Sequence, residues 1–453
     1  MELVKKAVDY ARKKGADAAE AVISDSSNAE ISVSAKEVEQ VKAYDEAGIG
    51  IRILKDQKMI FGSSNDLSWN SVVDMITGLM AKVPYHTPDE FNVFSTEKDG
   101  VLEKPWSSYT DRISFDPKIV EVPVEKKIKR AIQLEAAGLG FSPQVKGSMY
   151  CMYRDGVVYM YFANSHGISG WYPSSGCGGG VEFSAVEGED QQSGGHQAGT
   201  VKYDDFDPEA VGKKAAKNAV GMLGAKPMES CDVPLVVTPE VGTSLFGYIV
   251  GMLSADAVQK GKSLFADKIG KAVASKYLSL IDDGTLKGGF DTHPVDGEGV
   301  PRQVTPLIVD GVLKNYLYDC YNAKRGKVKT TGNRSRSSYA SPGRIDCTNL
   351  YMKAGKEKAE KIIASIDKGF YLDNAFGLHA GIDSTSGDFS IPISGFKIEK
   401  GEITSPVRGV SMGGNLFEFL KSIDKVGDDL TWTFSLACPT FSVKNVKIGG
   451  SKA

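Results

Sequence analysis

Alternation of apolar and polar residues is the feature that most limits how this chain can fold. Apolar side chains recur at every second position around Ile31–Val33 and again over Ile49–Ile53, and Met59–Phe61 follows a polar turn at 55–57. A period of two places apolar side chains on one face of a β-strand. Residues 31–61 therefore predict antiparallel strands joined as a meander.

Segments with helical spacing surround these strands. Apolar residues fall on one helical face at 3–11, at 72–83 after the capping residue Ser68, and at about 124–137. The pattern predicts further helices at about 208–223, from about 240, and at about 356–368. We predict an α+β fold, with an N-terminal α+β domain that contains an antiparallel sheet and a larger C-terminal, mostly antiparallel β domain with a few helices. The expected boundaries are 1–225, divided into units at 1–95 and 96–225, and 226–453.

Glycine-containing segments mark the predicted turns and loops. Asp155-Gly156 stands between the apolar runs 149–153 and 157–162, which predicts a hairpin with a two-residue turn. Further hairpins are expected at Asp310-Gly311 and Lys400-Gly401. The glycine-rich stretches 176–180 and 193–195 predict flexible loops.

Charge and hydropathy exclude two classes of partner. The 453 residues include 54 basic and 57 acidic side chains, a net charge of -3, so no broad positive field is available for nucleic acid. The longest apolar stretch, Val241–Leu253, is too short to span a bilayer and predicts a buried helix. With no signal-peptide pattern at the start, we expect a cytoplasmic protein without nucleic acid or membrane partners.

No complete set of catalytic or metal-binding residues is visible in local motifs. None of the five histidines is spaced as a helical ligand pair, and neither H-E-x-x-H nor G-x-S-x-G occurs. The six cysteines form no C-x-x-C pair, which is typical of reduced, buried thiols.

Two polar segments each leave two interpretations. Asp296 and Glu298 stand two residues apart, so an extended backbone would direct both carboxylates into one cavity, as acid–base chemistry requires. Glycines 297 and 299 favour instead a tight turn with a close backbone approach. The loop 331–336, with Asn333 and Arg334, is either an arginine fork for an anion or a solvated loop, and we favour the solvated loop.

An ordered set of short motifs extends over nearly the whole chain. The motifs are G-I-G-I-R at 48–52, G-K-S-L-F at 261–265, D-G-E-G-V-P at 296–301, L-I-V-D-G-V-L at 307–313, T-G-N at 331–333, G-D-F-S at 387–390, P-V-R-G at 406–409 and G-N-L at 414–416. Each motif alone is weak, but their order and spacing resemble the TldD/PmbA family, whose members were once described as modulators of DNA gyrase.

The resemblance implies that this chain lacks the family's zinc site. TldD-type chains carry His-Glu-x-x-x-His on a helix and a further cysteine ligand near the C-terminus. Counting back from Ser263 places Phe246, Gly247 and Gly251 at the histidine, glutamate and histidine positions. Phenylalanine and glycine offer zinc no lone pair and water no base. The surroundings of Cys438 resemble the other chain type, called PmbA or TldE, so we expect no catalytic residue, metal or cofactor in this chain.

The resemblance also implies a partner and a substrate. A PmbA-type chain pairs with a TldD-type peptidase subunit, which would hold the zinc, and the pair acts on unfolded or small peptides. Strand addition is a physical basis for binding them, and the aromatic segments 150–162 and 171–172 would line such a cleft. Candidate residues of the substrate cleft are Tyr248, Asp296, Glu298, Gly299, Asn333 and Arg334.

The sequence leaves two other functions open. One is a stand-alone homodimeric protein that binds peptides or regulates a target without hydrolysis. The other is an enzyme with altered chemistry that uses Asp296, Glu298 or the Arg334/Arg336 loop. A neighbouring reading frame that encodes His-Glu-x-x-x-His would favour the heterodimer over the stand-alone protein.

Overall fold

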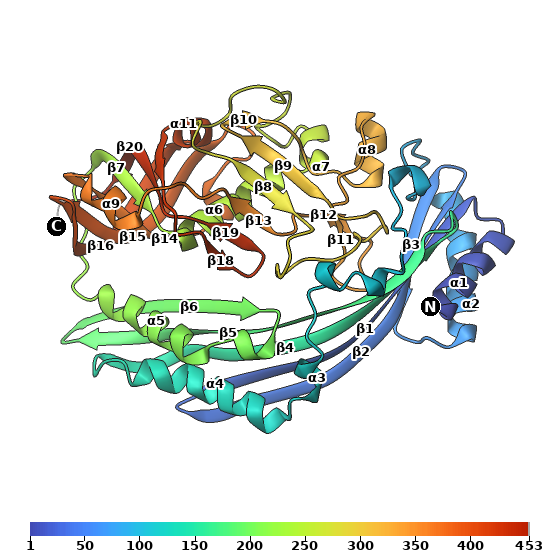
Figure 1. Ribbon diagram of the computed structural model, residues 1–453, viewed down its shortest axis with the longest axis horizontal. Coiled ribbons are helices and arrows are strands. Elements are labelled where there is room, and N and C mark those ends of the chain that lie inside the picture. Colours follow the sequence, from blue (N-terminus) through green and yellow to red (C-terminus); the bar gives the residue numbers. More distant parts are fainter. Residues whose placement is uncertain (452–453) are drawn as a thin grey trace.

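A six-stranded antiparallel sheet forms most of the N-terminal half. The computed structural model describes residues 1–451. The strands of this N-terminal sheet are long and curved, and their order is β3-β2-β1-β4-β5-β6 (Figure 1). Their bounds are β1 Ala18–Ser34, β2 Glu37–Lys55, β3 Lys58–Ser64, β4 Val145–Asn164, β5 Ser169–Glu187 and β6 Asp190–Thr200. Strands from residues on both sides of 95 thus join one sheet.

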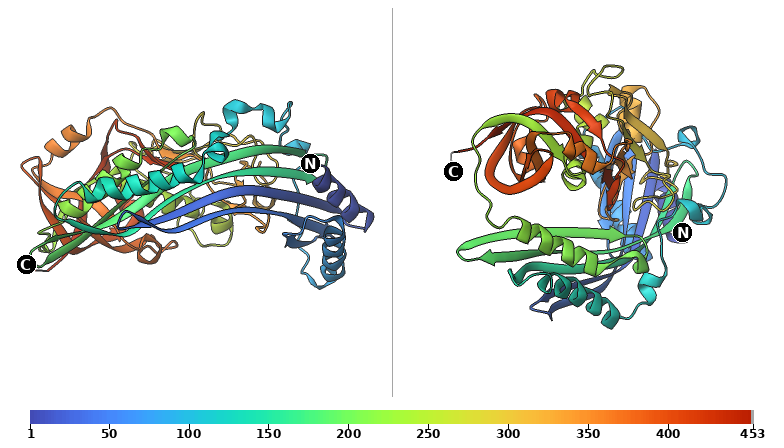
Figure 2. Two further views of the ribbon diagram at one scale, coloured as in Figure 1. Left: turned by 90° about the horizontal axis from the view of Figure 1, so that it is seen from below. Right: turned by 60° about the vertical axis from the view of Figure 1, so that its left-hand side comes forward.

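Four helices cover the outer face of this sheet. Helices α1 (Glu2–Lys13) and α2 (Trp69–Lys82) pack at one end, and α4 (Val124–Leu139) and α5 (Pro208–Gly221) pack at the other (Figure 2). Ser68 caps α2, as the sequence predicts, and Asp207 caps α5. Odd-numbered residues of β1 lie in the cores beneath these helices, so its even-numbered residues face the C-terminal half.

The predicted hairpin turn at Asp155-Gly156 is wrong, because β4 continues through both residues. Asp155 is buried on the helix-covered face, where its carboxylate accepts hydrogen bonds from Lys127 Nζ at 2.8 Å and from the Tyr153 hydroxyl at 2.9 Å. Gly156 lies on the opposite face, where a Cβ atom would stand 2.5 Å from Asn28 Oδ1. Contacts with residues of other elements therefore stabilise the Asp-Gly pair inside a strand, whereas its local propensity favours a turn.

The predicted loops at 176–180 and 193–195 are also wrong, because these residues lie inside β5 and β6. Glycine is present because neighbouring atoms occupy the space of a side chain. A Cβ on Gly194 would stand 2.2 Å from the backbone nitrogen of Ala219 in α5, and one on Gly178 would stand 2.5 Å from the carbonyl oxygen of Ala198. These glycines permit close packing within and behind the sheet.

The C-terminal half contains two further six-stranded sheets, ordered β16-β15-β14-β7-β20-β17 and β10-β9-β8-β13-β19-β18. Most pairings are antiparallel, with β7–β14 and β13–β19 parallel. The strands are β7 Cys231–Val237, β8 Leu280–Asp283, β9 Val304–Val309, β10 Val312–Leu313, β13 Leu350–Met352, β14 Lys368–Ala375, β15 Asp388–Glu399, β16 Glu402–Asn415, β17 Ile423–Val426, β18 Thr431–Thr433, β19 Leu436–Cys438 and β20 Phe441–Gly449. The α+β fold class predicted from the sequence is confirmed.

Helix α6 (Pro239–Met252) packs in the core that these two sheets share. The smaller elements are α3 Lys118–Glu121, α7 Ala255–Gln259, α8 Cys320–Gly326, α9 Ala359–Ala364, α10 Leu378–Gly381, α11 Leu416–Lys421, β11 Arg334–Ser335 and β12 Arg344–Ile345. The helix predicted at 356–368 is shorter than expected, because β14 begins at Lys368 and pairs with β7. The hairpins predicted at Asp310-Gly311 and Lys400-Gly401 are confirmed.

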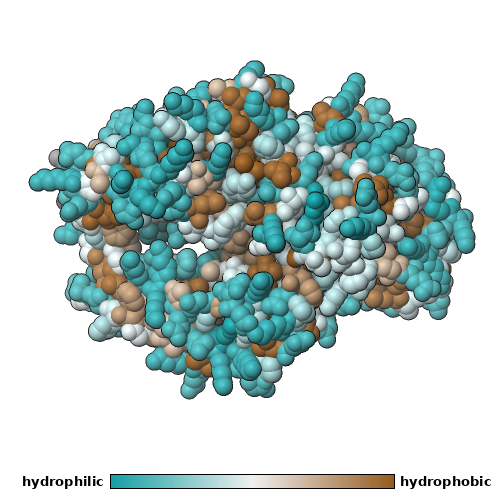
Figure 3. Space-filling view, viewed as in Figure 1, coloured by the Kyte–Doolittle hydropathy of each residue, from teal (hydrophilic) through white to brown (hydrophobic). Residues whose placement is uncertain are grey.

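The C-terminal half lies over the inner face of the N-terminal sheet and leaves part of it uncovered. Near β2 the two halves are in tight contact, since the ring of Tyr339 rests on Gly48 and its carbonyl oxygen approaches Gly50. Near β6 a space-filling view shows an opening between the halves (Figure 3). Within residues 1–451 no helix is both long and apolar enough to cross a membrane.

Candidate functional site: a cleft between the two halves

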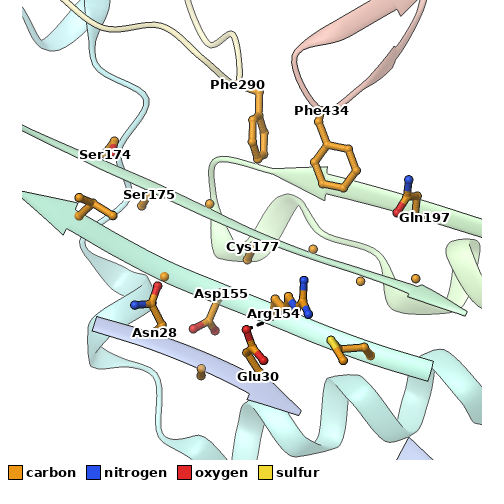
Figure 4. A pocket seen from close by; sticks show the side chains of 18 of the residues that line it. Asn28, Glu30, Arg154, Asp155, Ser174, Ser175, Cys177, Gln197, Phe290 and Phe434 are labelled. Atoms are coloured by element: carbon orange, nitrogen blue, oxygen red, sulfur yellow. Dashed lines mark ion pairs between the residues drawn. The ribbon is translucent and has the colours of Figure 1, made fainter. Parts of the chain in front are cut away.

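A cavity of about 620 Å³ lies between the inner face of the N-terminal sheet and two loops of the C-terminal half. We call it the cleft. Strands β1, β4 and β5 line one side of it, and side chains from residues 290–293 and 434–435 line the other (Figure 4). Its size lies within the range of pockets that bind small molecules or short peptide segments.

Glycines make part of the sheet beneath the cleft free of side chains. Gly176, Gly178 and Gly180 alternate along β5 on its inner face, and Gly199 of β6 pairs with Gly178. We call these four residues the glycine face. Cys177 lies between them but points to the covered side, where it is buried. A bound molecule can therefore approach the backbone of β5 closely.

Two phenylalanine rings from the C-terminal half rest on the glycine face. Phe290 and Phe434 are in edge-to-face contact, with ring centroids 5.4 Å apart and ring planes at 82°. A Cβ on Gly176 would stand 3.1 Å from the Phe290 ring, and one on Gly199 would stand 2.2 Å from the Phe434 ring. We call Phe290 and Phe434 the aromatic pair; both rings extend from their loops toward the strands of the N-terminal sheet (Figure 4).

Both rings of the aromatic pair are held by their own loops. Phe434 is at the tip of the β18–β19 hairpin with φ of 53°, a left-handed conformation that bulky residues rarely adopt. The loop of Phe290 is fixed by buried Asn349, which accepts a hydrogen bond from the backbone N–H of Asp291 at 3.0 Å and donates to the carbonyl oxygen of Asp283 at 2.9 Å. Ser114 also donates to the carbonyl oxygen of Gly289.

The cleft offers hydrogen-bonding groups of both charges. Arg154 and Glu30 form an ion pair at 3.6 Å and are partly exposed. His293 Nε2 lies 2.9 Å from Asp291 Oδ1, and its ring stacks on Tyr172. Although burial acts to raise the pKa of Asp291, the hydrogen bond from His293 makes the net shift downward. These groups can orient a polar ligand by donating and accepting hydrogen bonds.

The cleft does not present a reactive thiol. Cys177 lies under the glycine face, and burial raises the pKa of its thiol to about 11. The thiol is therefore protonated near neutral pH and is not a nucleophile there. Only part of the aromatic segments that were predicted to line a cleft does so. Tyr150 lines the cleft, whereas Tyr172 packs behind His293 and Trp171 stacks on Tyr161.

The three positions that the resemblance assigns to the zinc motif lie on α6. Phe246 is 2% exposed, and its ring packs on Phe441 with centroids 6.0 Å apart. Gly247 faces Leu436, and Gly251 is exposed to solvent with no atom within 4 Å of an added Cβ. None of these positions carries a nitrogen, oxygen or sulfur side-chain atom, so they do not fit a zinc ion. Their correspondence to the zinc motif stays a prediction.

Residues near these three positions on α6 do not supply metal ligands in their place. Cys438 packs beneath α6 against Gly242, and burial raises the pKa of its thiol well above the usual value. In residues 1–451 no three His, Cys, Asp or Glu side chains are grouped so that they could hold a metal ion. The Tyr248 hydroxyl donates to the carbonyl oxygen of Ile382 at 3.2 Å and does not line the cleft.

Asp296, Glu298 and Gly299 lie together, away from the cleft, where the two halves are in direct contact. The carboxylate of Glu298 is fully buried and accepts hydrogen bonds from Arg52 Nη2 at 3.2 Å and from the backbone N–H of Cys320 at 2.9 Å. Asp296 accepts from the backbone N–H groups of Glu298, Val300 and Arg334 at 2.8–3.0 Å. Each of the two carboxylates thus has partners within the protein.

Glu298 belongs to a buried group of charges that we call the charged interface: Glu20, Arg52, Glu298 and Arg336. Arg52 forms a two-bond pair with Glu20 at 2.8 and 2.9 Å, and Arg336 also donates to Glu20. Despite burial, the pKa of Glu20 is lowered by Arg336 and Arg52. Burial, followed by the neighbouring charge of Glu298, raises the pKa of Asp296 to about 7.

The turn at 296–299 and the loop around Asn333 both lie at the contact between the N-terminal and C-terminal halves. Gly299 has φ of 78° and a Cβ there would stand 2.9 Å from Ile168 and Phe162, so the tight turn favoured from the sequence is what the structure shows. Asn333 donates to Asp282 Oδ2 at 2.7 Å, and Arg334 donates to Asp319. Arg336 of the same loop donates to Glu20 of the N-terminal sheet, so the loop is packed against both halves, and the interpretation as a solvated loop is wrong.

Most of the residues that line the cleft were not predicted as site residues from the sequence. One signal was present: glycines at 176, 178 and 180 have the period of two of a strand with one bare face. No local pattern distinguishes Phe290 or Phe434 from other aromatic residues, because their position depends on contacts between distant segments.

Comparisons with known proteins match the whole chain to one group. Models for the first, central and C-terminal domains of PmbA/TldA metallopeptidases match residues 19–81, 117–223 and 230–450. The chain is 25% identical over 456 residues to a protein named Metalloprotease PmbA from Escherichia coli O157:H7, covering 99% of this chain and 96% of that relative. It is 35% identical over 255 residues to a Metalloprotease TldD homolog from Buchnera aphidicola, covering 53% and 52%.

Two solved structures match the fold of this chain over nearly its full length. A Bacteroides thetaiotaomicron protein described as a candidate modulator of DNA gyrase is 25% identical, with a TM-score of 0.90 and coverage of 99% of this chain and 98% of that one. TldE from Thermococcus kodakarensis is 22% identical, with a TM-score of 0.88 and coverage of 99% and 100%, and shows the same fold.

Proposed function

The chain belongs to the PmbA/TldD family of metallopeptidase-like proteins, and on that basis we propose that it is the non-catalytic, substrate-handling subunit of a heterodimeric zinc peptidase. The zinc and the water-activating glutamate belong to a TldD-type partner, and the substrates are unfolded or small peptides. A cytoplasmic location is part of the same proposal.

One observation carries the non-catalytic assignment. Phe246 occupies the first position of the expected motif and lies in the hydrophobic core against Phe441, so the helix has an apolar contact where a ligand would stand. Gly247 and Gly251 have no side chain that could bind a metal or activate water. Residues of α6 therefore contribute packing, and the proposed chemistry depends on another chain.

The cleft supports the substrate-handling part of the proposal. Its glycine face permits a peptide backbone to lie close to β5, and the partly exposed Arg154–Glu30 pair offers polar contacts at its side. The carboxylates of Asp296 and Glu298, by contrast, are buried and hydrogen-bonded within the protein, which disfavours the enzyme with altered chemistry.

Co-expression with a TldD-type chain tests the proposal. We expect co-purification, zinc in the partner only, and cleavage of an unfolded peptide that requires both chains. A matched partner whose motif glutamate is replaced by glutamine should still bind this chain but abolish cleavage. One tightly bound zinc per lone chain, measured by mass spectrometry of the metal, would contradict the non-catalytic assignment. Homodimers that bind peptides but never associate with the partner would favour the stand-alone function.

A further inference from the structure

A second cavity of about 760 Å³ adjoins the cleft on the other side of the aromatic pair. Among the described residues, Phe290 and Phe434 are the two that line both cavities. The aromatic pair is therefore a partition one side chain thick, and side chains of neighbouring residues in one extended ligand could reach both spaces.

The second cavity differs from the cleft in its lining. Its inner surface includes Phe115, Tyr351 and Trp432 in addition to the aromatic pair. The rings of Tyr351 and Trp432 are 5.9 Å apart and inclined at 55°. Trp432 is 38% exposed, which is high for a residue that usually buries most of its large apolar surface. Aromatic rings arranged around an open space provide edge and face contacts for another ring.

The charges around the second cavity do not favour a cation over an anion. Lys202 and Lys287 stand at its edge together with Asp111 and Asp205, and all four residues are exposed. Opposite charges in equal number give little net attraction for an ion, so the aromatic lining decides what binds. A neutral, bulky side chain matches this lining better than a lysine or a carboxylate does.

The backbone conformation of Phe434 also indicates that its surroundings hold the aromatic pair in place. Phe434 keeps φ of 53° at the hairpin tip, a conformation that persists in a bulky residue only where its surroundings hold it. Here the surroundings are Gly199 below the ring and Phe290 beside it. The glycine provides the space that lets the strained hairpin tip divide the two cavities.

We propose that the second cavity is a subsite for an aromatic side chain of the peptide, while adjacent residues of the same peptide lie over the glycine face in the cleft. The subsite rests on the proposed peptide-handling function and names the class of peptide that is preferred: unfolded segments that contain a tryptophan, tyrosine or phenylalanine.

Three labelled unfolded peptides test the subsite. They differ only at a central position, which is tryptophan, alanine or lysine, and their dissociation constants are measured by fluorescence anisotropy. The protein is the full chain with a partner whose motif glutamate is replaced by glutamine, so that no peptide is cleaved. We expect the tryptophan peptide to bind about tenfold to hundredfold more tightly than the alanine peptide, as burial of a large apolar side chain implies.

Two substitutions at partly exposed residues locate the preference. Trp432 lines the second cavity and not the cleft, whereas Arg154 lines the cleft and not the second cavity. Trp432→Ala should remove most of the tryptophan preference and leave alanine-peptide affinity unchanged, and Trp432→Phe should restore the preference. Arg154→Ala should change the affinity for the tryptophan and alanine peptides by the same factor.

The outcomes separate the subsite from the proposed function. Equal binding of the tryptophan and alanine peptides, or an equal effect of Trp432→Ala on both, would overturn the subsite while peptide handling stands. Preference for the lysine peptide would also overturn it and indicate a cation site. If none of the peptides binds the complex of the unsubstituted chain with the inactive partner, the proposed function fails and the subsite fails with it.

Discussion

Two glutamates on the same face of β1 have opposite surroundings. Glu20 and Glu30 both face the C-terminal half, and each is directly opposite an arginine on the next strand, Arg52 on β2 and Arg154 on β4. The side chain of Glu20 is 1% exposed, and that of Glu30 is 26% exposed. At the charged interface the C-terminal half adds Glu298 and Arg336, whose charges cover the pair. At the cleft it adds the aromatic pair, Asp291 and His293, and the Arg154–Glu30 pair stays partly exposed.

The difference shows how one sheet serves two purposes. An arginine–glutamate pair that is covered by complementary charges becomes part of the contact between the halves, because water can no longer replace a lost partner. The same pair beneath a cavity remains available to a ligand and contributes little to stability. Whether an arginine–glutamate pair stabilises the contact or stays available to a ligand therefore depends on where the C-terminal half covers the sheet, and not on the pair itself.

Removal of one arginine from each pair is the strongest test of this comparison. Arg52→Ala leaves Glu20 and Glu298 buried without their shared partner, so we expect a loss of about 3–5 kcal/mol in the free energy of unfolding. Arg154→Ala, at a side chain that is 61% exposed, should cost less than about 1 kcal/mol. Denaturant unfolding of both variants measures the contrast, and equal losses would mean that the two ends of the sheet do not differ in this way.

Addition of one methyl group tests the glycine face. In Gly199→Ala the new Cβ would stand 2.2 Å from the Phe434 ring, so the aromatic pair must shift, and we expect a loss of about 1–3 kcal/mol in stability. Gly147→Ala on β4 is the matched control, because no atom lies within 4 Å of its added Cβ. We expect the control to change stability by no more than about 0.5 kcal/mol. An unchanged Gly199→Ala protein would show that Phe434 does not rest on this face.

The pH dependence of stability tests the surroundings of Asp296, which lies beside Glu298 of the charged interface. In the folded protein Asp296 holds its proton up to a pKa of about 7, whereas its usual value is 3.8. Between these values the folded state binds one more proton than the unfolded chain, so this contribution to stability falls as pH rises and is constant above pH 7. The expected slope is at most about 1.4 kcal/mol per pH unit.

Asp296→Asn isolates that slope. The variant should show a shallower decrease between about pH 5 and 7, because it lacks the contribution of Asp296 while buried carboxyl groups such as Asp282 keep theirs. The window lies above the usual pKa of Glu20, whose lowered value acts only at more acidic pH. Thermal or urea unfolding at several pH values in this window gives the comparison. A variant with the same slope as the native protein would show that Asp296 is ionised in the folded state.

Much of the fold was predictable because it depends on local periodicity and caps. Ser68, Asp207 and Asp310-Gly311 have the local roles that their types favour, and the sequence placed the corresponding helices and hairpin correctly. Asp155-Gly156 and the glycines of β5 were misassigned because their roles depend on partners that are distant in the sequence, such as Lys127 and Phe290.

The candidate site was predictable only in part. Asp296 and Glu298 were chosen because two carboxylates stood close together, yet the structure surrounds both with internal partners. The cleft depends on the absence of side chains at Gly176, Gly178 and Gly180 and on two phenylalanines from separate loops, and a sequence pattern does not show which loop lies over which strand.

The sequence by itself determined the alternation of strands and helices, the balanced charge and the absence of ligand atoms at 246, 247 and 251, because these depend only on residue type and spacing. The tertiary structure decided which polar groups are buried and which face a cavity. Burial is a property of the contact between the two halves, and it depends on pairs such as Arg52–Glu298 and Gly199–Phe434 that are more than two hundred residues apart.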